Sequence, residues 1–270
     1  MKRKTSLFFL LLCTATALCA KVKLPSLVGD NMILQQQAVV KLWGWATPRS
    51  TVRVIPSWDG QTAICHADDT GRWTIRLATP AAGYTPYEIT FNDGEALTVR
   101  NVLVGEVWLA SGQSNMQMPL KGFAGCPVQD GLDDAIAAAQ TDKGVRMFNV
   151  PTRQSYAPQE DCAGRWMTTQ DFTDVMEFSA TAFYFASNLS RALHVPVGIV
   201  NCAYGGSKVE SWLPRDILEA YPDVPTDSAS IARVQPDYER PMLAYNGMFS
   251  PVRHYTVKGI IWYQGCSNVS

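Results

Sequence analysis

The sequence of 270 residues is poor in the residues on which several common kinds of function depend. It contains three histidines, and its seven cysteines show none of the paired spacings that are typical of zinc sites. Lysine and arginine number 23 against 24 aspartates and glutamates, and no basic run occurs after Lys2, Arg3 and Lys4 at the N-terminus. These shortages argue against a zinc site and against nucleic acid as a partner.

Long apolar runs are also missing, apart from one short run near the N-terminus. The apolar residues 7–12 follow Lys2, Arg3 and Lys4, and small residues before and at Ala20 offer a cleavage site. This apolar centre is too short to cross a bilayer, which takes about 20 residues. We therefore predict a signal peptide over residues 1–20, export to the periplasm or the extracellular space, and no membrane span.

Beyond the predicted signal peptide, the remaining cysteines are Cys65, Cys126, Cys162, Cys202 and Cys266. Export permits disulfides. Two of these cysteines, Cys126 and Cys162, lie in segments rich in glycine and proline and are candidates for a disulfide, but the sequence leaves the pairing open. We expect Cys202 and Cys266 to be free, because both lie near the ends of predicted strands.

Residues 21–101 show the alternation of apolar and polar residues that is typical of half-buried strands. The segments with this pattern are 40–43, 51–54, 73–77 and 87–91. We predict a small β-sandwich domain. Its tryptophans Trp43, Trp45 and Trp58 either stack on sugars or fill the core and the domain interface, and the sequence leaves both interpretations open.

Residues 102–270 alternate predicted strands with predicted helices. Apolar strand segments begin at Val102, Val145, Pro196 and Val257, and helical periodicity covers 133–140 and 178–193. Such alternation indicates a parallel sheet between two helical layers, a three-layer α/β/α sandwich. Ligands of open sheets of this kind bind at the carboxyl ends of the strands.

The first predicted strand of this region runs directly into Gly112-Gln113-Ser114-Asn115-Met116. A small residue two positions before a serine allows a sharp turn that presents the hydroxyl at the edge of the sheet. Ser114 is therefore a candidate acyl-transfer nucleophile, although serines in such loops often only cap a helix. The usual nucleophile elbow of α/β-hydrolases, Gly-x-Ser-x-Gly, is not met, because position 116 is methionine.

Two later strands end in related motifs. The strand over 196–203 leads to Gly205-Gly206-Ser207, with Glu210 and Trp212 close behind. The strand over 257–263 leads to Gln264-Gly265-Cys266-Ser267-Asn268. Glycine with serine or asparagine thus follows three strands of the predicted sheet.

These three motifs, in this order, resemble those of the SGNH hydrolases, and within them the sialate O-acetylesterase family of carbohydrate esterases. The resemblance implies a serine esterase that acts on an acetylated sugar or glycan without metal or cofactor. It implies that Ser114 is the nucleophile and that the oxyanion hole is formed by the backbone N–H of Gly206, less favourably that of Gly205, and the side-chain amide of Asn268. The possible substrate pocket comprises Gln113, Asn115, Gly205, Glu210, Trp212, Gln264 and Cys266.

The sequence departs from the family pattern in two respects. The family's base is a histidine in a late Asp-x-x-His segment, whereas this sequence ends at Ser270. His66 falls in the β region, and His194 and His254 precede strands, which places them at the wrong edge of the sheet. We therefore expect a chain that is incomplete at its C-terminus and has little or no turnover. The second departure is Cys266, where the family has glutamate.

Three functions remain open at this stage. The first is a secreted carbohydrate O-acetylesterase that resembles sialate O-acetylesterase. The second is an esterase for acetylated plant polysaccharides, and the third is a non-catalytic sugar-binding pseudo-enzyme. The sequence leaves the sugar, the acetyl position and the oligomeric state open.

Overall fold

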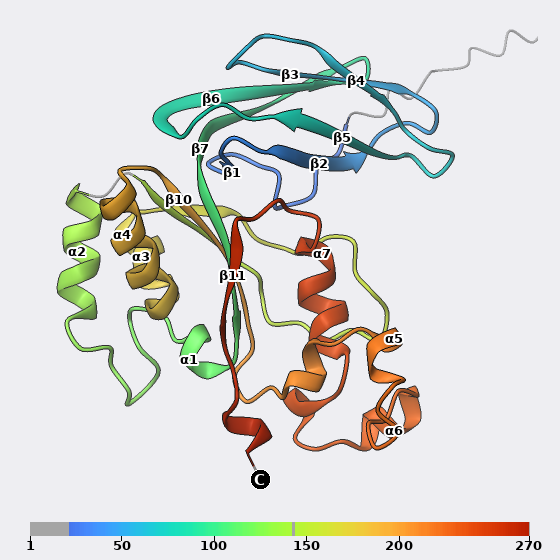
Figure 1. Ribbon diagram of the computed structural model, residues 1–270, viewed down its shortest axis with the longest axis vertical. Coiled ribbons are helices and arrows are strands. Elements are labelled where there is room, and N and C mark those ends of the chain that lie inside the picture. Colours follow the sequence, from blue (N-terminus) through green and yellow to red (C-terminus); the bar gives the residue numbers. More distant parts are fainter. Residues whose placement is uncertain (1–21, 142–143, 270) are drawn as a thin grey trace, which may run out of the picture.

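The computed structural model describes residues 22–141 and 144–269 (Figure 1). The predicted signal peptide, residues 1–20, lies outside the described residues. Over the ranges that are described, none of the helices combines the length and the apolar character that crossing a membrane requires.

The N-terminal part is a β-sandwich, as predicted (Figure 1). One layer contains β4, β3, β6 and the first half of β7 in antiparallel order, and the other is the antiparallel pair β2–β5. Alternate residues of β5 are buried, so one face of each sheet packs on the other. The strands are β1 (Ile33–Gln35), β2 (Val39–Trp45), β3 (Thr51–Pro56), β4 (Ala63–His66), β5 (Arg72–Ala78), β6 (Gly83–Asn92) and β7 (Ala96–Gly112).

Strand β7 joins the sandwich to the rest of the molecule. It is 17 residues long, pairs antiparallel with β6 through its first half, and continues as a central strand of the second sheet. The predicted boundary between residues 101 and 102 falls inside this strand. The division into two domains at this boundary remains a proposal, because the two parts share β7.

The C-terminal part is built on a mostly parallel sheet in the order β11-β7-β10-β8-β9. Only β9 runs antiparallel to its neighbour in this order. Strand β10 is buried throughout, whereas β11, paired with β7 at the edge, is largely exposed. The strands added here are β8 (Val145–Asn149), β9 (Trp166–Thr168), β10 (Val197–Ala203) and β11 (Gly259–Tyr263).

Helices cover both faces of this sheet, which gives the predicted three layers (Figure 1). Alternate residues of β10 face opposite sides: Ile199 packs with α4, and Val200 packs with the segment around Met248. One helical layer contains α2 (Gly131–Thr141), α3 (Phe172–Met176) and α4 (Ala180–Leu193). The other contains η1 (Val209–Trp212), α5 (Arg215–Leu218), α6 (Ser228–Arg233), η2 (Asp237–Glu239), η3 (Tyr245–Phe249) and α7 (Ser250–Val252).

The ends of α4 follow from its flanking residues. Ser179 caps the helix by accepting a hydrogen bond from the N–H of Ala182, and His194 ends it in the left-handed conformation at φ 54°. The remaining short helices, α1 (Ser114–Gln117) and η4 (Cys266–Asn268), lie directly after β7 and β11.

The candidate disulfide between Cys126 and Cys162 is not formed in the described chain. Both are free thiols in the described chain; Cys126 is exposed and Cys162 is buried. Cys162 packs in the same core cluster as Cys202, and burial raises the pKa of the Cys162 thiol to about 12. Cys162 is buried among apolar residues that are distant in the sequence. A local composition rich in glycine and proline does not reveal such contacts.

Candidate active site

Gly112 ends β7 and turns the chain sharply toward Ser114. Its φ is +140°, and an added Cβ would lie 2.1 Å from the carbonyl oxygen of Tyr263, so only glycine fits there. The N–H of Gln113 then donates to the same Tyr263 oxygen at 3.0 Å. The turn leaves Ser114 half-buried as the first residue of α1, at the carboxyl edge of the sheet.

The loop after β10 packs directly against Ser114. An added Cβ on Gly205 would lie 3.6 Å from the Cβ of Ser114, which measures how closely the two backbones approach. The N–H of Gly205 donates to Oε1 of Gln117 at 2.8 Å. The N–H of Gly206, by contrast, donates no hydrogen bond within the part of the chain that the structure describes. Of the two glycines, Gly206 is thus the one whose N–H has no hydrogen-bond acceptor among the described residues.

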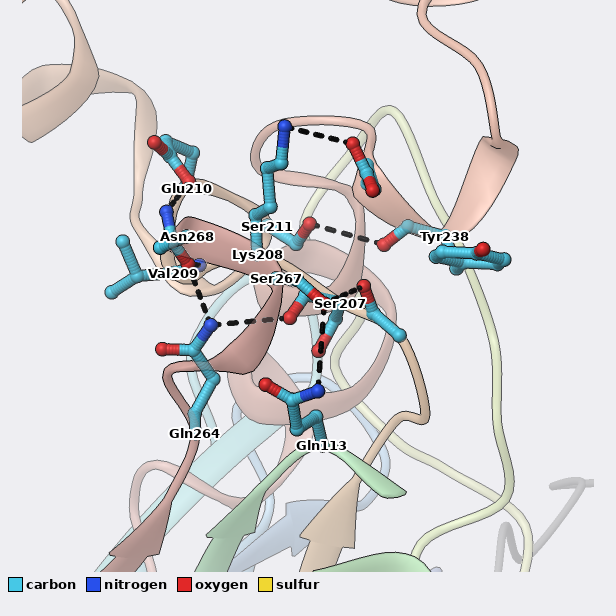
Figure 2. Close-up of polar contacts among 12 residues, drawn as sticks. Gln113, Ser207, Lys208, Val209, Glu210, Ser211, Tyr238, Gln264, Ser267 and Asn268 are labelled. Atoms are coloured by element: carbon cyan, nitrogen blue, oxygen red, sulfur yellow. Dashed lines mark hydrogen bonds and ion pairs between the residues drawn. The ribbon is translucent and has the colours of Figure 1, made fainter. Parts of the chain in front are cut away.

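Gln113 connects the first loop to the third (Figure 2). Its side chain is buried, accepts from the N–H of Gly265 at 3.1 Å, and donates to Oγ of Ser267 at 3.4 Å. The hydroxyl of Ser267 in turn donates to the carbonyl oxygen of Gly206 at 2.8 Å. One short chain of hydrogen bonds therefore holds all three loops together, as the sequence predicted for the ends of three parallel strands.

Asn268 lies on the outer side of this network (Figure 2). Its amide nitrogen donates to Oε2 of Glu210 at 3.0 Å, and its oxygen accepts from the side chain of Gln264 at 2.6 Å. The same oxygen accepts from the N–H of Val209 at 3.0 Å. An amide NH₂ has two donor hydrogens, so the bond to Glu210 leaves one for another acceptor.

The other candidate residues of the substrate pocket occupy unequal positions. Asn115 and Cys266 are exposed, and Asn115 also accepts from Thr181 through its carbonyl oxygen. Trp212 is buried, donates through its indole N–H to Oγ of Ser207 at 2.9 Å, and packs edge-on against Trp262. Trp212 thus holds Ser207 of the second loop through this hydrogen bond.

The polar groups around Ser114 are mainly uncharged. Two charged groups adjoin this network: Glu210, which binds Asn268, and Lys208, whose Nζ lies 2.9 Å from a carboxylate oxygen of Glu239. The hydrogen bond to the Glu239 carboxylate raises the pKa of Lys208, so Lys208 stays charged and the carboxylate balances its charge. The site therefore offers amide and hydroxyl dipoles with little net charge.

The three histidines lie in other parts of the molecule. His66 ends β4, where its Nδ1 is 3.3 Å from Oγ1 of Thr51. His194 ends α4 before β10, and His254 follows α7 before β11. The two latter positions are at the amino edge, as predicted, so none of the three accompanies Ser114.

Sequence reasoning missed three groups that shape the site. Gln117 orients Gly205, Ser267 bonds to Gly206, and the ring of Tyr238 lies so close to Gly206 that a Cβ there would meet it at 2.5 Å. The N–H of Ser114 itself also donates no hydrogen bond within the described residues. Of these groups, the sequence could have indicated only the Ser114 N–H. Ser114 begins a helix, and the first N–H groups of any helix lack intrahelical acceptors.

Among the residues that the structure describes, no group of three or more histidine, cysteine, aspartate or glutamate side chains is arranged to hold a metal ion.

Fold and site together define the class: this is a three-layer α/β protein of the SGNH-like type, with a serine at the carboxyl edge of its sheet. The model of one family, the carbohydrate esterases described as sialic acid-specific acetylesterases, matches residues 104–270. The chain belongs to this family of carboxylic ester hydrolases.

Individual relatives agree with the family model. Sialate O-acetylesterases of Pongo abelii and Homo sapiens are each 27% identical over 270 aligned residues, which cover 91% of this chain and 49% of the relative. A crystal structure of a carbohydrate acetylesterase from Xanthomonas citri is 37% identical, superposes with a TM-score of 0.79, and is matched over 92% of this chain and 52% of its own. The chain spans about half the length of the curated relatives it matches.

Proposed function

We propose that the protein is a secreted carbohydrate O-acetylesterase whose nucleophile is Ser114. The observation that carries this proposal is the convergence of three loops at the carboxyl edge, where the Gly205 backbone packs on Ser114 and Gln113 and Ser267 link the loops. Neutral donors around a half-buried hydroxyl suit ester cleavage, because negative charge develops on the former carbonyl oxygen.

The proposed reaction has two steps. Oγ of Ser114 forms a bond to the acetyl carbonyl carbon, the bond from that carbon to the sugar oxygen breaks, and the sugar hydroxyl leaves with the proton that Ser114 gave up. Water then attacks the acetyl-serine, and acetate leaves while the Ser114 hydroxyl is restored. Neither step calls for a metal or a cofactor.

The oxyanion would be bound by the N–H of Gly206 and the amide of Asn268. The commitment of the Gly205 N–H to Gln117 supports Gly206 over its neighbour. The bond from Asn268 to Glu210 supports a positioning role for that carboxylate. One such donor can be worth about 3–4 kcal/mol of transition-state stabilisation.

The proton of Ser114 needs a base, and none of the three histidines lies beside it. We therefore propose that the 270-residue chain by itself turns over slowly. Residual catalysis of about 10³–10⁴-fold over water can persist from an oxyanion hole and substrate binding without a complete triad. The same geometry keeps the second candidate open, a protein that binds acetylated sugars with no turnover.

The substrate class follows from the family and from the named activity of the relatives, which points to acetylated sialic acids. Acetylated plant polysaccharides are the alternative within the same chemistry, since the three motifs do not distinguish between sugars. Export to the periplasm or the extracellular space, directed by residues 1–20, would bring the enzyme to either substrate. Fractionation of cells that express the chain with and without residues 2–20 tests this point.

The decisive experiment compares the chain with Ser114→Ala on an aryl acetate, an O-acetylated sialic acid and an acetylated xylan. Ser57→Ala, which alters an exposed serine of the β-sandwich, is the matched control. We expect slow acetate release that disappears in Ser114→Ala and is unchanged in Ser57→Ala. Sugar binding with no acetate release above the Ser114→Ala background would favour the non-catalytic alternative.

A further inference from the structure

A cavity lies at the junction of the two parts of the molecule, away from Ser114. Its volume is about 320 Å³, and it is lined from β2, β5, the segment 158–160 and the end of α7. Figure 1 shows β2 facing α7 across this junction, while α1 lies toward the opposite end of β7. The volume falls at the lower end of the range for small-molecule sites, about 300–1,000 Å³, so it suits a single small unit.

The cavity contains two cationic side chains, Lys41 and Arg253, that both contact the ring of His254. Nζ of Lys41 lies 3.2 Å from Nδ1 of His254, and Nε of Arg253 lies 3.4 Å from Nε2 of the same ring. Within the described residues neither Lys41 nor Arg253 forms an ion pair with a carboxylate. The one carboxylate lining the cavity is Glu160, and it is already paired with Arg72.

The electrostatic consequence is a local excess of positive charge. Burial, followed by the charges of Arg76 and Arg253, lowers the pKa of Lys41. Burial, followed by the charges of Lys41 and Arg253, lowers the pKa of His254. Each cation thus raises the cost of charging its neighbour, and an anion placed among them would relieve that cost.

One wall of the same cavity is aromatic. Trp43, Trp45 and Trp73 all line it, and the ring of Trp43 packs edge-on against His254 at a centroid distance of 5.9 Å. Trp45 is only partly buried, and Nζ of Lys23 lies 5.3 Å from its ring centroid. An apolar aromatic surface beside cationic donors matches a ligand that has both an apolar face and an acidic group.

We propose that this cavity binds a sugar that carries a carboxylate, with the carboxylate between Lys41, Arg253 and His254 and the C–H face of the ring against the tryptophan wall. A carboxylate accepts several hydrogen bonds at once, which the convergent cationic donors supply. Sialic acids and uronic acids share this chemistry. The site stands apart from the proposed ester-cleaving site, because it lies at the amino end of the parallel strands and contains no residue of the Ser114 network.

The test is ligand binding to the 270-residue chain by ligand-observed NMR and tryptophan fluorescence. The probes are N-acetylneuraminic acid, its methyl ester, glucuronic acid, glucose and sodium acetate. We expect at least one free sugar acid to bind, and its methyl ester or the corresponding neutral sugar, glucose, to bind at least about 10-fold more weakly. The comparison of N-acetylneuraminic acid with glucuronic acid identifies the source of the carboxylate.

Variants locate the binding. Arg253→Met changes an exposed residue, and we expect it and Lys41→Met to weaken binding of the sugar acid at least about 5-fold each. Arg100→Met, which breaks an exposed pair with Glu88 outside the cavity, is the matched charge control.

Trp45→Ala should weaken binding, while Trp262→Ala, an exposed tryptophan on β11, should not. Ser114→Ala should leave binding unchanged, so this result is independent of the esterase assay.

Four results would overturn the proposal. The first is no binding of either sugar acid, and the second is equal binding of the acid and its uncharged counterpart. The third is equally tight binding of acetate, which would reduce the cavity to a general anion site. Loss of binding in Ser114→Ala with full binding in Arg253→Met would also overturn it, because the sugar acid would then occupy the other end of the strands.

Discussion

The two ends of the parallel strands β7, β10 and β11 carry different kinds of polar chemistry. At the carboxyl end, three loops are joined by amides, hydroxyls and backbone groups, with hydrogen bonds from Gln113 to Ser267 and from Ser267 to Gly206. At the amino end, Lys41, Arg253 and His254 crowd together without a carboxylate of their own. One end is a set of amide and hydroxyl dipoles with one carboxylate, Glu210, and the other brings two like charges, Lys41 and Arg253, against the ring of His254.

This difference suits the two ends of the strands to two kinds of negative charge. Neutral dipoles that are fixed in advance stabilise a charge that appears only during reaction, at little cost to the resting protein. Like charges near one another are costly in the resting protein, and a permanently charged ligand relieves that cost. The carboxyl end is therefore suited to a transient oxyanion and the amino end to a stable carboxylate.

The largest effect is expected at the carboxyl end, from Gly112→Ala. The added Cβ would meet the Tyr263 carbonyl at 2.1 Å at a positive φ, so β11 must shift. We expect a loss of about 2–5 kcal/mol in the free energy of unfolding, from overpacking and backbone strain together. Urea unfolding measures it. Gly60→Ala, at φ +66° with open space around it, is the control and should cost about 1–2 kcal/mol; equal losses in the two variants would contradict the close approach of β7 and β11.

The next effect concerns the connection between the loops. Gln113→Ala removes the acceptor of the Gly265 N–H and the donor to Ser267, so we expect a loss of about 1–3 kcal/mol and faster hydrogen exchange at Gly265. Gln61→Ala, an exposed glutamine in a turn, should stay within about 0.5 kcal/mol of the parent. Unchanged exchange at Gly265 would show that Gln113 does not hold the third loop.

A smaller effect is expected from Glu210→Gln. The bond from the Asn268 amide then goes to a neutral oxygen, which is worth roughly half of a charge-assisted bond, and we expect a loss of about 0.5–1 kcal/mol. Exchange of the Asn268 side-chain amide hydrogens, measured by NMR, should accelerate. Glu219→Gln, at an exposed position after α5, is the control, and no difference between the two variants would remove Glu210 as a positioning group.

The smallest effect is a change in titration at the amino end. Lys41→Met removes a positive charge beside His254, so the pKa of His254 should rise toward its ordinary value, while Arg100→Met should leave it unchanged. Since the lowered pKa belongs to the folded state, the unfolded chain binds this proton more readily, and His254 reduces stability as the pH falls below about 6.5. An NMR titration of the imidazole follows the shift, and an unchanged or lower pKa in Lys41→Met would contradict the cluster.

Much of the architecture could be predicted from local pattern. Alternation located β2, β3, β5 and β6, apolar runs located β8 and β10, and helical periodicity located α4. These features depend on neighbours within one strand or helix, which the sequence states directly. The convergence of the three loops was also predictable, because parallel strands bring their carboxyl ends to one edge.

The remaining features depend on contacts between residues far apart in the chain. Nothing local to Asn268 indicates that its amide binds Glu210, 58 residues earlier. Lys41 and His254 are separated by 213 residues and meet only because the sandwich folds back on α7. The burial of Cys162 likewise comes from packing beside distant strands, so composition alone could not decide whether it pairs with Cys126.

The most direct test of the central claim is the site of acylation after incubation of the chain with an aryl acetate. Intact-mass and peptide mass spectrometry would locate the acetyl group, with Ser114→Ala and Ser57→Ala treated in parallel. The account predicts one acetyl group on Ser114 that accumulates slowly, is missing from Ser114→Ala and is retained in Ser57→Ala. Acetylation that is spread over surface lysines, or that is equal in Ser114→Ala, would contradict the assignment of Ser114 as the nucleophile.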